Sequence, residues 1–192
     1  MELFAVRGFD AVSVAEVART AGVTEKTVFN HFSTKEDLVY SSDRVFEEQL
    51  IGAVRDRAAG LSVTDAVATF LLDRYAGFRN DPTRLVRHQL LSRLVSASPA
   101  LQSRERLVLA RYAGALQEVI AAEQGAAADD LRPRLAAETL MAAHGAVIGA
   151  FRSFALDGHR PEEYVPKVVR AAEQVFRMVI NGFGDYATKL AR

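Results

Sequence analysis

A short polar segment between residues 24 and 31 offers the clearest chemistry in this 192-residue chain. Its polar side chains after the first residue are those of Glu25, Lys26, Thr27, Asn30 and His31. They fall on the faces left free when Val28 and Phe32, one helical turn apart, point inward. Such side chains can donate hydrogen bonds to base edges and accept hydrogen bonds from them. A short helix that presents these side chains therefore suits the major groove of DNA.

Residues suited to catalysis or metal binding are arranged less favourably. The four histidines, at positions 31, 88, 144 and 159, include no pair spaced three or four residues apart. The chain has no cysteine, and it carries no nucleophile elbow, phosphate-binding loop or HExxH motif. We therefore expect no enzyme activity, no metal site and no cofactor.

Capping residues mark where the helices that position the polar segment begin. Ser13 with Glu16, and Ser33 with Glu36, each fit the capping box, in which a hydroxyl and a carboxylate satisfy free amides at a helix start. A glycine-containing turn interrupts the apolar face between them, and Thr24 can cap the helix that follows the turn. The pattern predicts a helix-turn-helix and the start of a further helix.

This arrangement resembles the N-terminal DNA-binding head of the TetR family of transcriptional regulators. The matching residues are Leu3-Phe4, Arg7-Gly8-Phe9, Ala11 to Ser13, Ala18, Ala21-Gly22-Val23, Val28-Phe29, His31-Phe32 and Lys35-Glu36-Asp37-Leu38. The resemblance implies an all-α fold of about nine helices, with a helix-turn-helix domain over residues 1–45 and a ligand-binding and dimerisation domain over residues 46–192. Family members carry more of the first helix and a short basic arm, so we expect the start of helix one to be missing here.

Within this head, residues can be assigned to bases and to phosphates. Those expected nearest the base edges are Thr24, Glu25, Lys26, Thr27 and Asn30. Matching family positions place four others nearest phosphates: Ser13, Phe29, His31 and Lys35. Three residues have a structural alternative, since Glu25 can serve only the helix dipole, Phe29 can be core, and His31 can be a hydrogen-bonded structural imidazole.

The charge balance of the head argues against tight non-specific DNA binding. The whole chain is neutral, whereas its first 40 residues hold four basic and six acidic residues and carry a net charge of minus two. Phosphate neutralisation supplies most non-specific affinity, so we expect a shallow salt dependence. DNA binding then requires that Lys26 and Lys35 face the DNA while the acidic residues face away.

Helical patterns continue through the rest of the chain, with no internal repeat and no alternating run that predicts a strand. Capping and proline signals place helices over residues 34–59, 63–79, 82–96, 99–123, 131–156 and 161–183, with a loop at 124–130. Pro166 allows a later start for the last helix. We find no apolar run near the roughly 20 residues of a membrane span and no signal peptide, so we expect a cytoplasmic protein with no membrane partner.

The last two predicted helices favour dimerisation. The last one repeats apolar residues at spacings of three and four, and the one before it is apolar around more of its circumference, with interleaved alanine and glycine. These faces predict an isologous four-helix bundle between two copies, although core helices of a monomer are the alternative. A homodimer would place two recognition helices about 34 Å apart on a palindrome.

The resemblance also implies a small-molecule site among the C-terminal helices. Candidate lining residues are Phe70, Arg74, Tyr75, Phe78, Arg93, Tyr112, Leu116, Met141, His144 and Phe151. Their mainly apolar character fits a largely apolar effector with a few polar anchors. Phe70, Leu116, Met141 and Phe151 fit a plain core equally well, and His144 fits either a core or a pocket.

One further stretch, from Ser96 to Tyr112, resembles actinobacterial members of the mycofactocin-regulator type. It contains the basic run Arg104, Arg106 and Arg111. The resemblance implies an acyl-thioester-like effector, whereas an arginine run by itself indicates a solvated helix face.

These patterns together predict a ligand-responsive regulator that binds a palindromic double-stranded DNA operator as a homodimer. Repression is the usual outcome when a dimer blocks a promoter, and activation stays open. The alternatives are a helical protein-interaction module and an orphan regulator without a small-molecule ligand.

Overall fold

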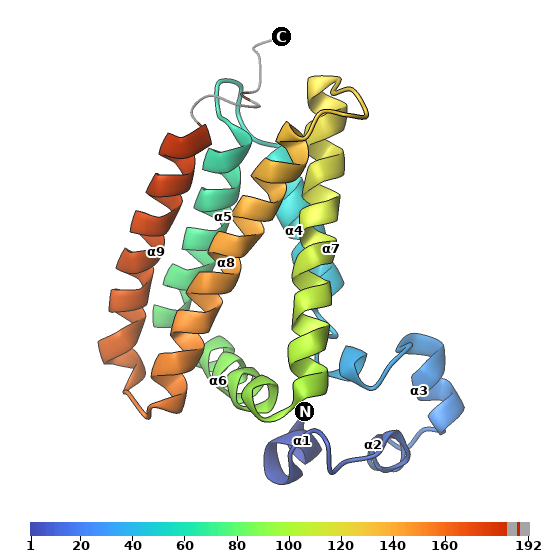
Figure 1. Cartoon of the computed structure of the whole chain (residues 1–192). Coiled ribbons are helices and arrows are strands. Elements are labelled where there is room, and N and C mark those ends of the chain that lie inside the picture. The colour runs from blue at the N-terminus through green and yellow to red at the C-terminus, as the bar shows by residue number, and fades with distance from the viewer. Residues whose placement is uncertain (184–187, 189–192) are drawn as a thin grey trace.

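Three short helices form a small head at one end of the molecule (Figure 1). They are α1 (Glu2–Arg7), α2 (Val14–Thr20) and α3 (Glu25–His31), followed by a 3-10 turn, η1 (Glu36–Leu38). Ser13 and Glu16 form the expected capping box at the start of α2. The hydroxyl of Thr24 accepts a hydrogen bond from the amide of Thr27 at the start of α3. The computed structural model, which describes residues 1–183 and 188, thus confirms the helix-turn-helix.

Six longer helices make up the rest of the described chain. They are α4 (Asp43–Arg55), α5 (Val63–Ala76), α6 (Pro82–Ala97), α7 (Pro99–Gln124), α8 (Arg132–Leu156) and α9 (Pro161–Phe183), with a 3-10 turn, η2 (Gly77–Arg79), after α5. α8 packs between α7 and α9, α9 also packs on α5, and α6 crosses the end of these helices nearest the head (Figure 1). The described residues contain no strand, and the predicted all-α class is confirmed.

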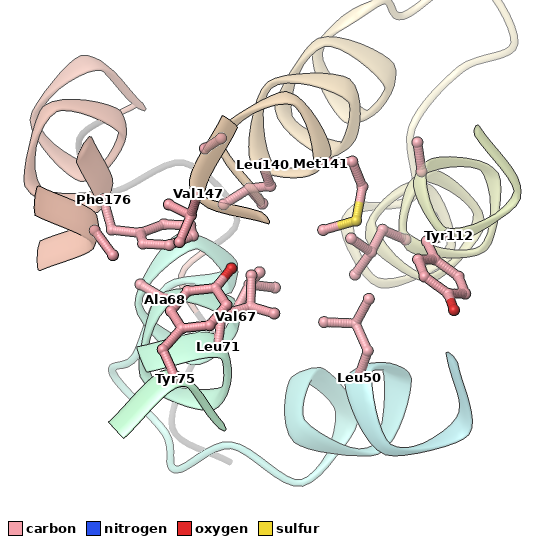
Figure 2. Packing of buried hydrophobic residues seen from close by; sticks show 14 of the residues in the cluster. Leu50, Val67, Ala68, Leu71, Tyr75, Tyr112, Leu140, Met141, Val147 and Phe176 are labelled. Atoms are coloured by element: carbon pink, nitrogen blue, oxygen red, sulfur yellow. The ribbon is translucent and has the colours of Figure 1, made fainter. Parts of the chain in front are cut away.

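Two apolar cores hold these helices together. The larger core draws on α4, α5, α7, α8 and α9, and Figure 2 shows Leu50, Leu71, Tyr112, Leu140 and Phe176 among its members. The smaller core joins the head to the corner between α6 and α7. Its buried members are Phe4, Phe9, Val12, Val39, Leu94, Val95 and Leu101. The head therefore packs against the long helices and shares its core with them.

α4 is shorter than the predicted helix over residues 34–59. Its start is delayed because residues 36–38 form η1 and Val39 turns into the smaller core. The expected capping box of Ser33 and Glu36 does not form in the described residues, because the Asp37 carboxylate accepts from the Thr34 amide instead. The chain leaves α4 after Arg55, where the guanidinium of Arg57 donates to the Val54 carbonyl oxygen.

The remaining helices follow the predicted ranges within a few residues. Pro166 lies inside α9, which begins at Pro161, so the later start does not occur. The predicted end of this helix near Gly184 lies outside the described residues. α8, over Arg132–Leu156, is long and apolar enough for a membrane span by length and composition, contrary to the sequence expectation. About a third of its apolar window is buried in the structure, where Leu140, Met141 and Phe151 pack against neighbouring helices.

Candidate nucleic-acid interface and effector cavity

Local contacts join α1 to α2 and set the turn that leads into α3. The Ser13 amide donates to Glu16 Oε2 at 2.8 Å, and the Arg7 guanidinium donates to Glu16 Oε1 at 2.6 Å, which ties the end of α1 to α2. Both contacts favour the charged carboxylate, and they hold the pKa of Glu16 at about 2. Between α2 and α3, Gly22 adopts a positive φ of 69°, as the tight turn requires.

The structure leaves the predicted DNA-contacting side chains on the surface. Ser13, Thr24, Glu25, Lys26, Asn30 and His31 are exposed, and Thr27 is half-buried. Phe29 is 49% exposed, so it is not a core residue, while Val28 is the buried residue of α3. The Lys35 ammonium lies 4.2 Å from the centre of the Phe9 ring, which fixes its position beside the head. The surface of α3 thus carries donors, acceptors and one ammonium.

Half of the acidic residues of the head are engaged in contacts. Arg7 pairs with Glu16, and Arg104 of α7 pairs with Asp37 at 2.6 Å. The carboxylate of Asp10 accepts from the Ser98 hydroxyl at 2.8 Å. These three carboxylates therefore have partners on α1, on α7 and at the junction between α6 and α7, whereas Glu25 stays exposed on α3 itself.

A cavity of about 350 Å³ lies between the head and the middle of the long helices. Its wall is formed by α4, α5, α6, α7 and α8 together with the link from η1 to α4. Of the predicted effector-binding residues, five line it: Arg74, Tyr75, Phe78, Tyr112 and His144. In the described part of the chain, no three His, Asp or Glu side chains gather in a way that could hold a metal ion.

The other five predicted effector-binding residues do not line this cavity. Leu116 and Phe151 are fully buried core residues, and Phe70 packs between Phe46 and Arg74. Arg93 points to solvent from α6. Met141 lies instead at a shallow hollow between α7 and α8. The apolar members of this group lie on apolar helix faces, as the cavity residues do. How the helices pack then decides whether such a residue lines the cavity or lies in the core.

Two neutral imidazoles are built into the cavity wall. His144 Nδ1 lies 2.6 Å from the Tyr75 hydroxyl oxygen. Burial, with a contribution from Arg74, lowers the pKa of His144 to about 4. Burial also lowers the pKa of His88 to about 4, with contributions from Arg152 and Arg84. Because burial raises the pKa of Tyr75, its hydroxyl keeps its proton and can donate to the neutral His144 ring.

The cavity is in direct contact with the start of α4. The ring of Phe46 stacks on His144 with centroids 5.4 Å apart and lies 4.9 Å from the ring of Tyr112. Arg111 of α7 donates to Glu47 at 2.5 Å and to Asp43 at 2.9 Å. A molecule in the cavity would therefore touch the helix that carries the head.

Several residues that line the cavity were not among the predicted effector-binding residues. They are Tyr40, Asp43, Phe46, Arg84, Arg87, His88, Ser92, Glu105 and Arg152. Arg84, His88 and Ser92 recur at a spacing of four on α6, which is the one signal that could have shown a polar stripe facing inward. Phe46 carries no such signal, because its role depends on how α4 packs against α5, α7 and α8.

Comparison with known proteins matches both halves of the chain. Residues 1–40 match the model for bacterial regulatory proteins of the tetR family, and residues 61–178 match the MftR C-terminal domain. The mycofactocin biosynthesis regulator MftR of Mycobacterium tuberculosis is 26% identical over 157 residues, which are 82% of this chain and 76% of MftR. The HTH-type transcriptional regulator TcmR of Streptomyces glaucescens is 28% identical over 138 residues, covering 70% of this chain and 61% of TcmR.

A solved structure shares the fold. The transcriptional regulator FadR of Bacillus subtilis, in complex with stearoyl-CoA, superposes with a TM-score of 0.54 at 19% identity and covers 94% of each chain. The relatives are transcription regulators, and none of those named here is an enzyme. With its DNA-binding head and MftR-type ligand-binding domain, this protein belongs to the TetR family of transcriptional regulators.

Proposed function

We propose that this protein is a ligand-responsive repressor that binds a palindromic operator as a homodimer and is released by a small, largely apolar effector. The observation that carries the proposal is the contact between the cavity and α4, through the Phe46 ring on His144. An effector that favours a different position of α4 would change the separation of two heads in a dimer. A coupling of about 1–3 kcal/mol would change DNA affinity by roughly 5- to 150-fold.

The surface of α3 supports the DNA-binding part of the proposal. Thr24, Glu25, Lys26, Thr27 and Asn30 would face base edges. Ser13, Phe29, His31 and Lys35 would lie nearest phosphates. A regulator that acts on bacterial DNA in this way would work in the cytoplasm.

α8 and α9 would supply the interface between the two copies. The outer surface of these helices carries exposed or half-buried apolar side chains, among them Leu135, Val175, Met178 and Val179. Replacing Val175 and Val179 by Glu should give monomers by light scattering, whereas an unchanged dimer would place the interface elsewhere.

The acyl thioester bound by FadR is a candidate effector class for this chain. The resemblance of residues 96–112 to mycofactocin-regulator-type members implies the same effector class. Adding stearoyl-CoA to the protein–DNA complex tests it directly, and release of the DNA would support it.

Selection of bound fragments from a random duplex library tests the DNA-binding proposal. Enrichment of a palindrome whose half-sites lie about one helical turn apart is the expected result. No enrichment by folded, dimeric protein would contradict the proposal and favour a protein-interaction module. On the selected operator, Lys35→Ala should weaken binding evenly across sequences and reduce the salt slope by about one per subunit. Altered base preference with an unchanged slope would contradict its phosphate role.

A further inference from the structure

The cavity presents more positive than negative charge to whatever enters it. Arg74, Arg84 and Arg87 line it, and within residues 1–183 none of the three forms an ion pair with a carboxylate. Arg74 donates to the amide oxygen of Gln49 at 2.8 Å, and Arg87 donates to the Ser42 hydroxyl at 2.9 Å. Both of these partners are neutral.

The acidic residues that line the cavity are already neutralised. Glu105 pairs with Arg152, and Asp43 pairs with Arg111 at 2.9 Å. The cavity wall therefore keeps an excess of positive charge that no residue of the described chain compensates. An anion that enters would meet guanidinium groups whose hydrogen bonding is incomplete.

Arg74 and Arg84 both line the cavity, and each guanidinium lies over an aromatic ring that also lines it, Phe46 for Arg74 and Phe78 for Arg84. The pKa of Arg74 is lowered by burial and then by the charge of Arg84, so the two guanidinium groups repel each other across the cavity. Arg84 lies against the Phe78 ring, 5.5 Å from its centroid. A Cβ added at Gly77 would lie 3.0 Å from Arg84 Nη1, so this guanidinium also packs closely on the backbone at the start of η2.

Two residues of α6 that line the same cavity each hold a buried polar atom without a partner in the described structure. The Ser92 side chain is 1% exposed, and its hydroxyl oxygen makes no hydrogen bond in the described structure. His88 Nε2, one helical turn earlier, is likewise buried and unpartnered. Buried polar atoms without partners are rare and costly in native structures, so both atoms point to a ligand group that completes them.

Aromatic and aliphatic side chains share the rest of the wall. Phe46, Tyr75, Phe78 and Tyr112 all line the cavity. The rings of Phe46 and Tyr75 lie against His144, the Phe78 ring lies against His88, and the Tyr112 ring lies against Phe46. A volume of about 350 Å³ is at the small end for ligand pockets. Flat rings are well suited to such a wall because aromatic pairs favour offset or edge-to-face contact.

We propose that the cavity binds an organic acid with an aromatic body, whose carboxylate lies between Arg74 and Arg84 and whose second polar group faces Ser92 and His88. The inference rests on the proposed function for its regulatory meaning, and it names an aromatic organic acid, in place of an acyl thioester, as the chemical class of that effector. Arg87, which is more exposed, would attract the anion towards the cavity.

A matched pair of fluorescent probes tests the charge requirement. 8-Anilino-1-naphthalenesulfonate and N-phenyl-1-naphthylamine share one aromatic body, and only the former carries an anionic group. The chain has no tryptophan, so probe fluorescence can be followed without interference. We expect the protein to bind the anionic probe at least about tenfold more tightly than the neutral one.

Variants then locate the binding site. Arg74→Met and Arg84→Met should each lower the affinity for the anionic probe about tenfold. Each should change the affinity for the neutral probe by less than about twofold. Arg93→Met is the matched control, since Arg93 lies on α6 beside the cavity residues but points to solvent, and it should change neither. On the unaltered protein, 2-naphthoate should displace the anionic probe and 2-naphthamide should not.

The outcomes separate this inference from the proposed function. Equal affinity for the two probes, or arginine variants that weaken both alike, would overturn the organic-acid assignment even if the protein selects an operator. If the anionic probe binds through Arg74 and Arg84 but the protein selects no DNA, the proposed function is contradicted and the assignment of an organic acid still holds. Circular dichroism of each variant checks that it is folded.

Discussion

The two ends of α4 are attached to α7 in different ways. At the near end, which joins the head, Arg111 pairs with Asp43 and Glu47 while its own side chain is 32% exposed. At the far end, Arg57 follows the helix with a side chain that is 1% exposed. It pairs with Glu123 at 2.5 Å and also donates to the carbonyl oxygens of Val54 and Leu61.

This difference indicates which end of α4 can move. Partly exposed ion pairs contribute about 0–1 kcal/mol each, whereas breaking a buried, hydrogen-bonded pair costs about 3–5 kcal/mol. The far end should therefore act as a pivot, and the near end should shift. The cavity lies beside the near end, because Asp43 and Phe46 are part of its wall. A ligand thus acts where α4 is held most weakly.

The largest expected effect comes from the far end. Arg57→Met removes the pair with Glu123 and the hydrogen bonds from the guanidinium to the carbonyl oxygens of Val54 and Leu61. We expect the free energy of unfolding to fall by about 3 kcal/mol, measured by urea denaturation. Arg44→Met, at an exposed position in the first turn of α4, is the control and should change it by less than about 0.5 kcal/mol. An equal fall in the free energy of unfolding in the two variants would contradict the assignment of the far end of α4 as a pivot.

Acid should loosen the near end through His144, on which the Phe46 ring stacks. The pKa of His144 is about 4 in the folded protein and 6.5 for the unperturbed group. Below pH 6.5 the unfolded chain therefore binds the proton first, so the stability present at neutral pH is lost as the pH falls towards 4. At pH 5 the loss from this residue is about 2 kcal/mol.

Unfolding curves measured between pH 7 and pH 4 test this. His144→Gln should remove about half of this pH dependence, because His88, whose pKa burial also lowers to about 4, still titrates. His31→Gln, which removes an exposed imidazole of the head, should leave it unchanged. If both variants titrate like the unaltered protein, the buried imidazole does not control the near end.

The head could be predicted from sequence because its structure is local. The capping of α2 by Ser13 and of α3 by Thr24 depends on residues three positions away, and both caps are present. The Ser33–Glu36 box fits the same rule yet does not form, because Asp37 is bonded to the Thr34 amide and paired with Arg104 from α7. Arg104, which is distant in the sequence, therefore helps to decide how this helix start is capped.

The cavity could be predicted only in part, for a physical reason. His144 and Leu116 both lie on apolar helix faces, yet His144 reaches the cavity and Leu116 is enclosed by the core. Helical spacing gives the face of a residue but not its position along the neighbouring helix. Phe46 and Arg84 were missed for the same reason, since they meet the other cavity residues only through the packing of α4 and α6.

A smaller effect on stability, with a larger effect on regulation, is expected at the near end. Arg111→Met should lower the free energy of unfolding by about 1 kcal/mol, because its pairs with Asp43 and Glu47 are partly exposed. It should nevertheless change affinity for the selected operator by about fivefold or more, since it frees the end that carries the head. Fluorescence anisotropy on labelled operator measures this. A larger change from Arg57→Met than from Arg111→Met, at a temperature where both are folded, would reverse the assignment of pivot and moving end.

The smallest effect extends the comparison to two serines that are equally buried, at 1% exposure each. The Ser98 hydroxyl caps α7 by accepting from the Leu101 amide and also donates to Asp10, so Ser98→Ala should destabilise the protein by about 1 kcal/mol. The Ser92 hydroxyl has no partner among the residues that the structure describes. Ser92→Ala should therefore stabilise the protein by up to about 1 kcal/mol, because an unsatisfied buried group is removed. Thermal unfolding of both variants measures the two signs. If Ser92→Ala destabilises the protein as Ser98→Ala does, its hydroxyl serves the fold and cannot count as a group that awaits a ligand beside the near end of α4.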